Sequence, residues 1–188
     1  MGENIRDRLT RFNARQDNSI VLHAVPGHFA TSQSHINYYI DMTSLKSRSR
    51  EAREVARFLQ SASMHRIDMV DTIVCMDGTE VIGAFLAEEL EKNHISIANM
   101  HETIYVVSPE TNSANQFLFR ENTRPAVAGK HVLLLMASIT TGETARRSLE
   151  CIEYYGGIVE GVTAIFSTKS QVGGKQVFSV FTQEDLPG

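Results

Sequence analysis

The chain has no excess of basic residues and no long apolar run, and each of these shortages excludes a class of protein. Its 188 residues include 18 lysines and arginines against 22 aspartates and glutamates, for a net charge of −4. Proteins that bind nucleic acids usually present a basic face to the phosphates, so we expect no nucleic-acid partner. No apolar stretch approaches the roughly 20 residues of a membrane-spanning helix, so we expect no membrane partner.

Cysteine and histidine are also sparse or scattered. The two cysteines, Cys75 and Cys151, fall in different predicted elements, and we interpret them as reduced, buried thiols. The seven histidines show no HxxxH or HExxH spacing and no Cys-x-x-Cys is present, so the sequence offers no metal site built by the protein. The N-terminus, MGENIRDRLTRF, has charges where a signal peptide needs an apolar stretch, which predicts a cytoplasmic protein.

A hydrophobic content of 42% is enough for one good core, so we expect a single domain over residues 1–188. From Val70 onwards predicted strands alternate with predicted helices, which indicates an α/β protein with a parallel sheet and right-handed crossovers. The predicted strands are 72–76, 103–107, 132–136, 158–167 and 176–181, and the predicted helices are 81–90 and 142–155.

The N-terminal third is predicted to hold two helices around a small sheet. Ile5, Leu9 and Phe12 recur at helical spacing, which predicts an amphipathic helix over residues 4–15. The further predicted elements are a strand over 19–25 that Pro26-Gly27 ends, a strand within 28–45, and a helix over 47–63.

The stretch VLLLMASITTGET, residues 132–144, joins a buried strand to a helix through a tight loop. Gly142 permits backbone dihedrals that other residues avoid, the first N–H groups of the helix point into the loop, and threonine hydroxyls surround them. Such a loop suits a phosphate dianion. The predicted phosphate-binding residues are Ser138, Ile139, Thr140, Thr141, Gly142, Glu143 and Thr144. The same pattern also fits a capped helix start in any α/β protein.

This stretch resembles the phosphoribosyl pyrophosphate (PRPP) signature of type I phosphoribosyltransferases, in which two acidic residues precede a Thr-Thr-Gly-x-Thr phosphate loop. Thr140, Thr141, Gly142 and Thr144 match the loop, whereas Met136 and Ala137 stand where the family has its acidic pair. The resemblance implies a Rossmann-like parallel sheet flanked by helices, with a small N-terminal hood. The hood and N-terminal helices would take about residues 1–65, the core about 66–188, and a lid-like loop 108–130.

The order of elements is similar to that of orotate phosphoribosyltransferases. Residues 37–41, NYYID, look like the end of that family's hood over the base, although Thr31, Ser32 and Gln33 stand where the family has a lysine for orotate. The resemblance implies a pyrophosphate loop at Met76, Asp77, Gly78 and Thr79, although an ordinary capped strand-to-helix connection fits these four residues equally well.

The polar segment between Val107 and Lys130 is too long for an ordinary connection. In the family it is a mobile loop that carries basic residues into the partner subunit's site, which implies a homodimer. Here its only cations are Arg120 and Arg124, the candidate catalytic residues. The apolar run 117–119 fits a packed arm or a dimer contact as well as a lid.

The resemblance therefore implies a protein that binds PRPP, ribose 5-phosphate or a nucleotide, with Mg²⁺ accompanying PRPP and with catalysis impaired by the lost acidic pair. The alternative is an active transferase for orotate or another base, in which Arg120 or Arg124 replaces the lid lysine and Asp77 or Glu80 compensates for the lost carboxylates. A third reading is a structural or interaction protein.

Overall fold

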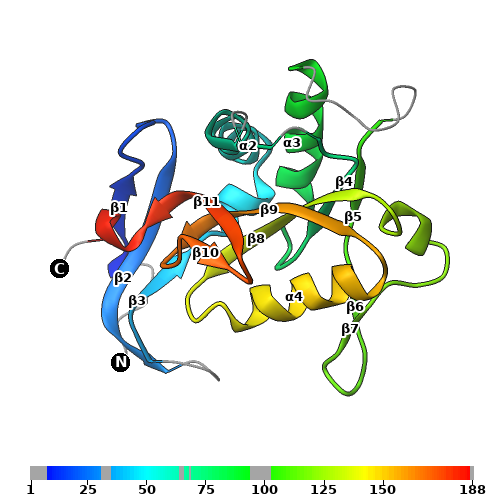
Figure 1. Ribbon diagram of the computed structural model, residues 1–188. Helices are drawn as coiled ribbons and strands as arrows, with labels where there is room; N and C mark the ends of the chain where they lie inside the picture. The colour runs from blue at the N-terminus through cyan, green and yellow to red at the C-terminus, as the bar shows by residue number, and fades with distance from the viewer. Residues whose placement is uncertain (1–7, 31–34, 64–65, 68, 94–102, 187–188) are drawn as a thin grey trace.

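The computed structural model describes residues 8–30, 35–63, 66–67, 69–93 and 103–186, and its centre is a six-stranded sheet in the order β10-β11-β9-β8-β4-β5 (Figure 1). The strands are β4 (Thr72–Cys75), β5 (Tyr105–Val107), β8 (His131–Ile139), β9 (Ile158–Ser167), β10 (Gln171–Val172) and β11 (Lys175–Thr182). Neighbouring strands are parallel except for the β10–β11 pair at one edge. The predicted α/β fold with a mostly parallel sheet is confirmed.

Helices cover both faces of this sheet. In Figure 1, α2 (Ser49–Ser63) and α3 (Glu80–Lys92) lie over one face and α4 (Glu143–Tyr154) lies over the other. Because successive residues of a strand point to opposite faces, β8 contributes to two separate apolar clusters. Leu133 and Leu135 pack in the cluster with α2 and α3, whereas Leu134 and Met136 pack in the cluster with α4. The strand is therefore buried on both sides, as its run of apolar residues predicts.

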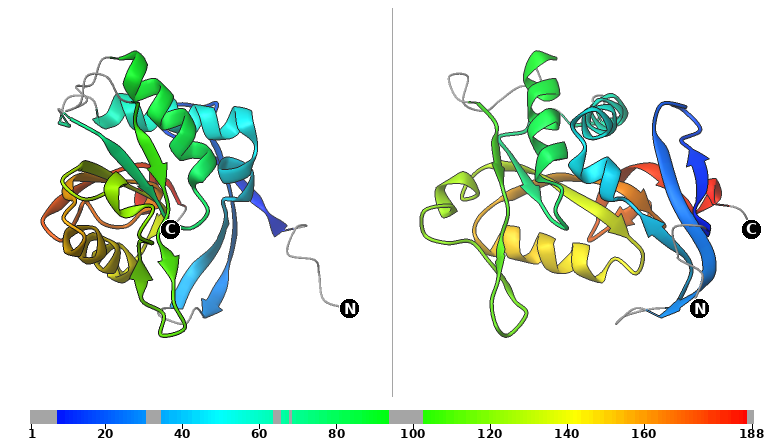
Figure 2. Two further views of the ribbon diagram at one scale, coloured as in Figure 1. Left: turned by 90° about the vertical axis from the view of Figure 1, so that its right-hand side faces the viewer. Right: turned by 180° about the vertical axis from the view of Figure 1, so that it is seen from behind.

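A second, antiparallel sheet stands beside the core. It consists of β1 (Thr10–Asn13), β2 (Val21–Ala30) and β3 (His35–Asp41), and the short helix α1 (Thr43–Ser47) leads from it to α2. Figure 2 shows this sheet close to the C-terminal end of the chain. An ion pair of 3.0 Å between Arg15 Nε and Asp185 Oδ1 ties the two regions together. The small sheet takes the place expected for the hood.

The predicted helix over residues 4–15 is wrong in its described part. Residues 4–7 lie outside the described residues, and Thr10–Asn13 forms β1, in which Phe12 pairs with Leu22 of β2. The i, i+3, i+4 spacing of apolar residues is a local signal only. Pairing with β2 provides the backbone hydrogen bonds that a short isolated helix cannot hold, so tertiary context decides the structure.

The strand predicted to end at Pro26-Gly27 continues to Ala30 instead. Strand β1 pairs with β2 only up to Ala24, so Pro26 lies beyond it and pairs with Tyr38 of β3 alone. A proline has no N–H to donate, and it is tolerated where one side of the strand has no neighbouring strand to bond. The β2–β3 register shifts between Pro26 and Phe29, which accommodates the break in the pattern.

The segment 108–130 is folded against the core rather than irregular. It forms a small hairpin of β6 (Glu110–Thr111) and β7 (Phe117–Leu118), followed by the 3₁₀ turn Arg124–Ala126. Phe119 is only 1% exposed, and its ring meets Tyr155 edge-on at a centroid distance of 5.4 Å. The apolar run therefore packs largely within its own chain.

Two further expectations concern the thiols and membrane spans. Cys75 is buried and Cys151 is half-buried, and both are free. Within the described residues, no helix has the length and apolar character needed to cross a membrane.

Candidate functional site

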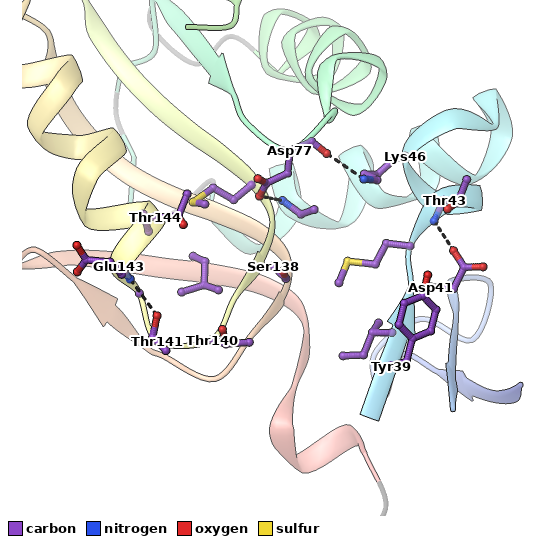
Figure 3. A pocket seen from close by; sticks show the side chains of 17 residues that line it. Tyr39, Asp41, Thr43, Lys46, Asp77, Ser138, Thr140, Thr141, Glu143 and Thr144 are labelled. Atoms are coloured by element: carbon purple, nitrogen blue, oxygen red, sulfur yellow. Dashed lines mark hydrogen bonds between the residues drawn. The ribbon is translucent and has the colours of Figure 1, made fainter. Parts of the chain in front are cut away.

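A cavity of about 390 Å³ opens between the carboxyl end of β8 and the hood (Figure 3). Such an edge of a parallel sheet is where α/β proteins bind their ligands. The residues around the cavity come from the hood, the β4–α3 loop, the end of β8 and the start of α4: Tyr39, Ile40, Asp41, Met42, Thr43, Lys46, Asp77, Met136, Ala137, Ser138, Ile139, Thr140, Thr141, Gly142, Glu143, Thr144 and Ala145.

All seven predicted phosphate-binding residues, 138–144, line this cavity. Gly142 precedes α4 with φ of 85°, a left-handed conformation that glycine adopts without steric cost. The first intrahelical bond of α4 runs from Arg146 N to Gly142 O, so the N–H groups of residues 143–145 have no partner within the helix. The N–H of Glu143 donates a hydrogen bond of 3.3 Å to Thr141 Oγ1. The remaining N–H groups of this turn suit an anion.

The β9–β10 connection holds the phosphate loop in place. Thr168 donates its hydroxyl to Thr140 O at 2.7 Å and its N–H to Ile139 O at 2.9 Å. Thr140 and Thr141 are exposed, whereas Thr144 is half-buried. The loop is therefore anchored through its backbone while its hydroxyl groups remain on the cavity side.

The acidic residue in the loop is neutralised locally. Glu143 accepts two hydrogen bonds from Arg146, one of 2.7 Å from Nη2 and one of 3.2 Å from Nε. The hydrogen bond from Arg146 is the main cause that lowers the pKa of Glu143. Because the guanidinium engages both carboxylate oxygens, the negative charge of Glu143 is screened from an anion bound at the loop.

The end of β8 carries no carboxylate. Met136 and Ala137, the positions predicted to correspond to the acidic pair of the PRPP signature, both line the cavity and are 1% and 6% exposed. Met136 packs in the cluster beneath α4, and Ala137 packs on the opposite face with α2 and α3. At these two positions the cavity wall is apolar.

A carboxylate reaches the same place from the neighbouring loop. Asp77 follows β4, and its Oδ2 accepts a hydrogen bond of 3.3 Å from Ala137 N. Partial burial against β8 raises the pKa of Asp77, although the N–H of Ala137, the charge of Lys46 and the N–H of Ser138 each oppose the rise. The site therefore has one carboxylate near the end of β8, and it comes from outside the signature.

Lys46 is the cavity residue that sequence reasoning missed. It lies in α1, and its Nζ donates a hydrogen bond of 2.9 Å to the main-chain oxygen of Asp77. In Figure 3, Lys46 and Asp77 meet across the cavity's upper edge, with the phosphate loop below. The one signal in the sequence is that Lys46 follows the hood strand β3 closely, in the short helix α1.

The other predicted loop residues lie behind the cavity. Thr79 is fully buried and donates its hydroxyl to Met76 O at 2.7 Å. Glu80 accepts a hydrogen bond of 2.8 Å from Ser108. Of the predicted pyrophosphate loop, Asp77 lines the cavity, whereas Met76, Gly78 and Thr79 are not among the described residues that surround it.

The two candidate catalytic arginines lie away from the cavity within this chain. Arg120 pairs with Glu110 of the hairpin at 2.6 Å. Arg124 donates to Phe119 O at 3.4 Å and its guanidinium lies 5.3 Å from the ring centroid of Tyr155. A catalytic role for either arginine, in its own subunit or a partner's, stays a prediction.

The hood contributes the opposite wall. Tyr39 is 44% exposed at the rim, and Asp41 accepts a hydrogen bond of 2.9 Å from Thr43 N at the start of α1. The segment 31–33, which stands where the orotate family has a lysine, lies outside the described residues. In the described part of the chain, no cluster of three or more His, Cys, Asp or Glu side chains is placed to hold a metal ion.

No protein-family model and no curated protein sequence matches the chain. Solved structures do match. UMP synthase from Leishmania donovani aligns with 86% of this chain at 17% identity and a TM-score of 0.59, and the chain spans 34% of that longer protein. Orotate phosphoribosyltransferase from Mycobacterium tuberculosis H37Rv, in complex with PRPP, aligns with 79% of this chain and 83% of its own at 16% identity and a TM-score of 0.58.

Adenine phosphoribosyltransferase from Thermoanaerobacter pseudethanolicus aligns with 95% of this chain and 97% of its own, at 14% identity and a TM-score of 0.54. At these identities the likeness is one of fold. Enzymes for a pyrimidine and for a purine base are both among the matches, so the fold leaves the base open. The chain has the type I phosphoribosyltransferase fold.

Proposed function

We propose that this protein binds a phosphorylated ribose, as PRPP, ribose 5-phosphate or a nucleotide, with the phosphate in the loop 140–144. The carrying observation is the combination of Gly142 in the left-handed conformation with the first-turn N–H groups of α4 and three threonine hydroxyl groups at one end of the cavity. The PRPP complex of the Mycobacterium tuberculosis orotate enzyme supports the ligand class, because that protein has the same fold.

The proposed binding is accompanied by weak catalysis. Transfer of a phosphoribosyl group passes through a state with positive charge on the ribose, and pyrophosphate departs, so the sugar must be held firmly and the departing charge stabilised. Met136 and Ala137 supply no carboxylate for the ribose hydroxyls. Without a replacement, the loss of two charged hydrogen-bond acceptors would weaken sugar binding by about 3–6 kcal/mol, or roughly a hundredfold to ten-thousandfold.

An active transferase for orotate or another base is the second candidate, and the place of Asp77 favours it. One carboxylate at the end of β8 and one lysine beside it are present in the cavity. In this candidate, Arg120 or Arg124 would have to reach a partner's cavity to assist the leaving pyrophosphate. Any Mg²⁺ would arrive with the diphosphate of PRPP, and Asp77 is a cavity carboxylate that contacts the end of β8.

Two measurements on the wild-type protein separate these candidates. Calorimetric titration with PRPP, ribose 5-phosphate and ribose tests binding, and we expect both phosphates to bind and ribose not to. A pyrophosphate-release assay with orotate and with adenine tests turnover, and we expect none above background. Brisk release with either base would replace the first candidate by the second, and the failure of both phosphates to bind would reject both.

We also propose a homodimer, because the fold's lid segment is placed to serve a partner subunit in the orotate family. The proposal rests on that resemblance, and Phe119 itself is buried within its own chain. Sedimentation equilibrium should give twice the 21.0 kDa mass of one chain. A monomer at high protein concentration would contradict the proposal and would remove any route for Arg120 or Arg124 into the cavity.

A further inference from the structure

We propose that Asp77, held in place by Lys46, recognises the ribose hydroxyls in place of the missing acidic pair, so that the cavity selects ribose 5-phosphates over 2-deoxyribose 5-phosphates. This inference rests on the proposed function, because it places the ligand's phosphate in the loop 140–144. It adds the residue that reads the sugar and the class of sugar that it selects.

The first argument is position. Strand β4 pairs with β8 as far as Cys75 and Leu135, and the next main-chain bond runs from Met76 N to Leu135 O. Beyond this bond the chain turns away towards α3. The N–H of Ala137 then donates to the Asp77 carboxylate at 3.3 Å instead of to a main-chain oxygen of β4. The carboxylate therefore lies at the position in the sheet where the signature's own acidic residues begin.

The second argument is capacity. An ionised carboxylate has about four acceptor sites, and the N–H groups of Ala137 and Ser138 leave about two of them for other donors. The two oxygens of one carboxylate can accept from the two neighbouring hydroxyls of a ribose, and 2-deoxyribose lacks one of these donors. A single correctly placed Asp77 is thus sufficient to distinguish the two sugars.

The third argument is the backbone. Asp77 has φ of 59°, and Gly78 after it has φ of 73°. Besides glycine, aspartate and asparagine are the residues that adopt this left-handed conformation most readily, so Asp77 fits the turn and its carboxylate is carried on a defined backbone. Lys46 donates to the Asp77 carbonyl oxygen at 2.9 Å and thereby fixes the peptide that carries the carboxylate.

The other two carboxylates of the described cavity wall are engaged elsewhere. Asp41 accepts the N–H of Thr43 at the start of α1. Glu143 accepts hydrogen bonds from Nε and Nη2 of Arg146. Asp77 is therefore the acidic side chain best placed to meet a sugar between the phosphate loop and the hood.

The test is a calorimetric comparison of ribose 5-phosphate, 2-deoxyribose 5-phosphate and inorganic phosphate. We expect the wild type to prefer the ribose compound by about tenfold or more, the usual weight of a hydrogen bond to a charged group. Asp77→Asn should bring that ratio close to one while the affinity for inorganic phosphate stays the same or rises. Asparagine is the residue after glycine that best accepts a left-handed conformation, so this variant should fold.

Glu80→Gln is the matched control, because it neutralises the next acidic residue along the chain, at the start of α3. Glu80 does not line the cavity in the described structure. This variant should keep the wild-type ratio. Lys46→Met, which removes the hydrogen bond to Asp77 O, should lower the ratio by less than Asp77→Asn does.

The two proposals fail in different ways. If the wild type binds ribose 5-phosphate but Asp77→Asn leaves the ribose preference intact, the inference is overturned and the proposed function stands. If the wild type binds none of the three compounds, the proposed function is overturned and the inference with it.

Discussion

Two units of this molecule share one local design and differ in chemistry. Strand β4 leads through a left-handed turn at Asp77 and Gly78 into α3, and β8 leads through a left-handed turn at Gly142 into α4. The two strands are hydrogen-bonded neighbours, and their helices lie on opposite faces of the sheet (Figure 1). Both turns therefore open at the same edge of the sheet, next to one cavity.

The difference lies in what each turn presents. The β8–α4 turn offers N–H groups and hydroxyls, and its one acidic residue is paired with Arg146. The β4–α3 turn offers the Asp77 carboxylate, and its hydroxyl group, on Thr79, is buried and bonded to Met76 O. One turn thus suits an anion and the other suits hydroxyl donors. Adjacent turns of opposite character are what a phosphorylated sugar requires.

The largest expected effect follows from placing an acidic residue at the end of β8. Met136 is 1% exposed in the cluster beneath α4, so Met136→Asp both removes apolar packing and buries a charge. We expect a loss of about 3–5 kcal/mol of the free energy of unfolding, measured by urea titration. The same change two positions on, Ser138→Asp, falls on a half-buried residue and should cost much less.

If Met136→Asp were tolerated without cost, the cavity end of β8 would be open to a charge, and the apolar wall would not explain weak catalysis. In that event the paired change with Ala137→Asp becomes informative. It should tighten PRPP binding through the ribose hydroxyls, and turnover should remain low because no lysine lies between Val107 and Lys130.

The next effect compares the β8–α4 turn at Gly142 with a left-handed turn at Gly129 that lies outside the cavity. Gly142→Ala adds a Cβ at φ of 85°, and Gly129→Ala adds one at φ of 70° with nothing within 4 Å, remote from the cavity. Both should cost roughly 1–2 kcal/mol of stability from backbone strain. Only Gly142→Ala should weaken ribose 5-phosphate binding, by about tenfold or more. Equal affinities in the two variants would show that this turn does not hold the phosphate.

A smaller effect concerns Asp77, in the β4–α3 turn, and the pH dependence of the protein's stability. The pKa of Asp77 is raised above its ordinary 3.8, chiefly by burial, so the folded protein holds that proton more tightly than the unfolded chain. This contribution to stability is present below the unfolded pKa and is lost as the pH rises through the folded pKa. Asp77→Asn should therefore gain stability relative to the wild type as the pH rises above about 4.

Chemical unfolding of both proteins across that range measures the difference. A relative loss for Asp77→Asn as the pH rises would mean that the Lys46 charge and the backbone N–H groups outweigh burial.

The smallest effect compares the one cysteine in each unit. Burial raises the pKa of Cys75, at the end of β4, to about 12 and that of Cys151, in α4, to about 11. Both thiols should be protonated at neutral pH and react slowly with a disulfide reagent, Cys151 before the fully buried Cys75. Mass spectrometry of partly labelled protein measures the order of labelling. If Cys75 were labelled before Cys151, the β4 unit would open more readily than α4.

The sequence predicted the β8–α4 unit well because its signals are local. Five successive apolar residues, a glycine and a helical pattern all lie within one stretch, and each implies the same structure. Strand β9 has the predicted bounds, 158–167, for the same reason. The sequence also located the candidate phosphate loop, whose seven residues all line the cavity.

The remaining features depend on contacts between distant residues. Thr10–Asn13 becomes a strand because β2 lies beside it, and the segment at 117–119 packs because α4 is there to cover it. Lys46 and Asp77 are 31 residues apart, and their meeting depends on where α1 sits over the sheet edge. No periodicity or motif encodes such a contact, so the Lys46–Asp77 side of the cavity could not be assembled from the sequence.

A crystal of the wild-type protein soaked with ribose 5-phosphate tests most directly whether the β8–α4 turn is a phosphate site. The expected result is a phosphate within hydrogen-bond distance of the N–H groups of residues 144 and 145 and of the Thr141 and Thr144 hydroxyls, with the sugar directed towards Asp77. A loop that stays empty with its N–H groups turned away, at a concentration that saturates the protein in solution, would contradict the proposed function.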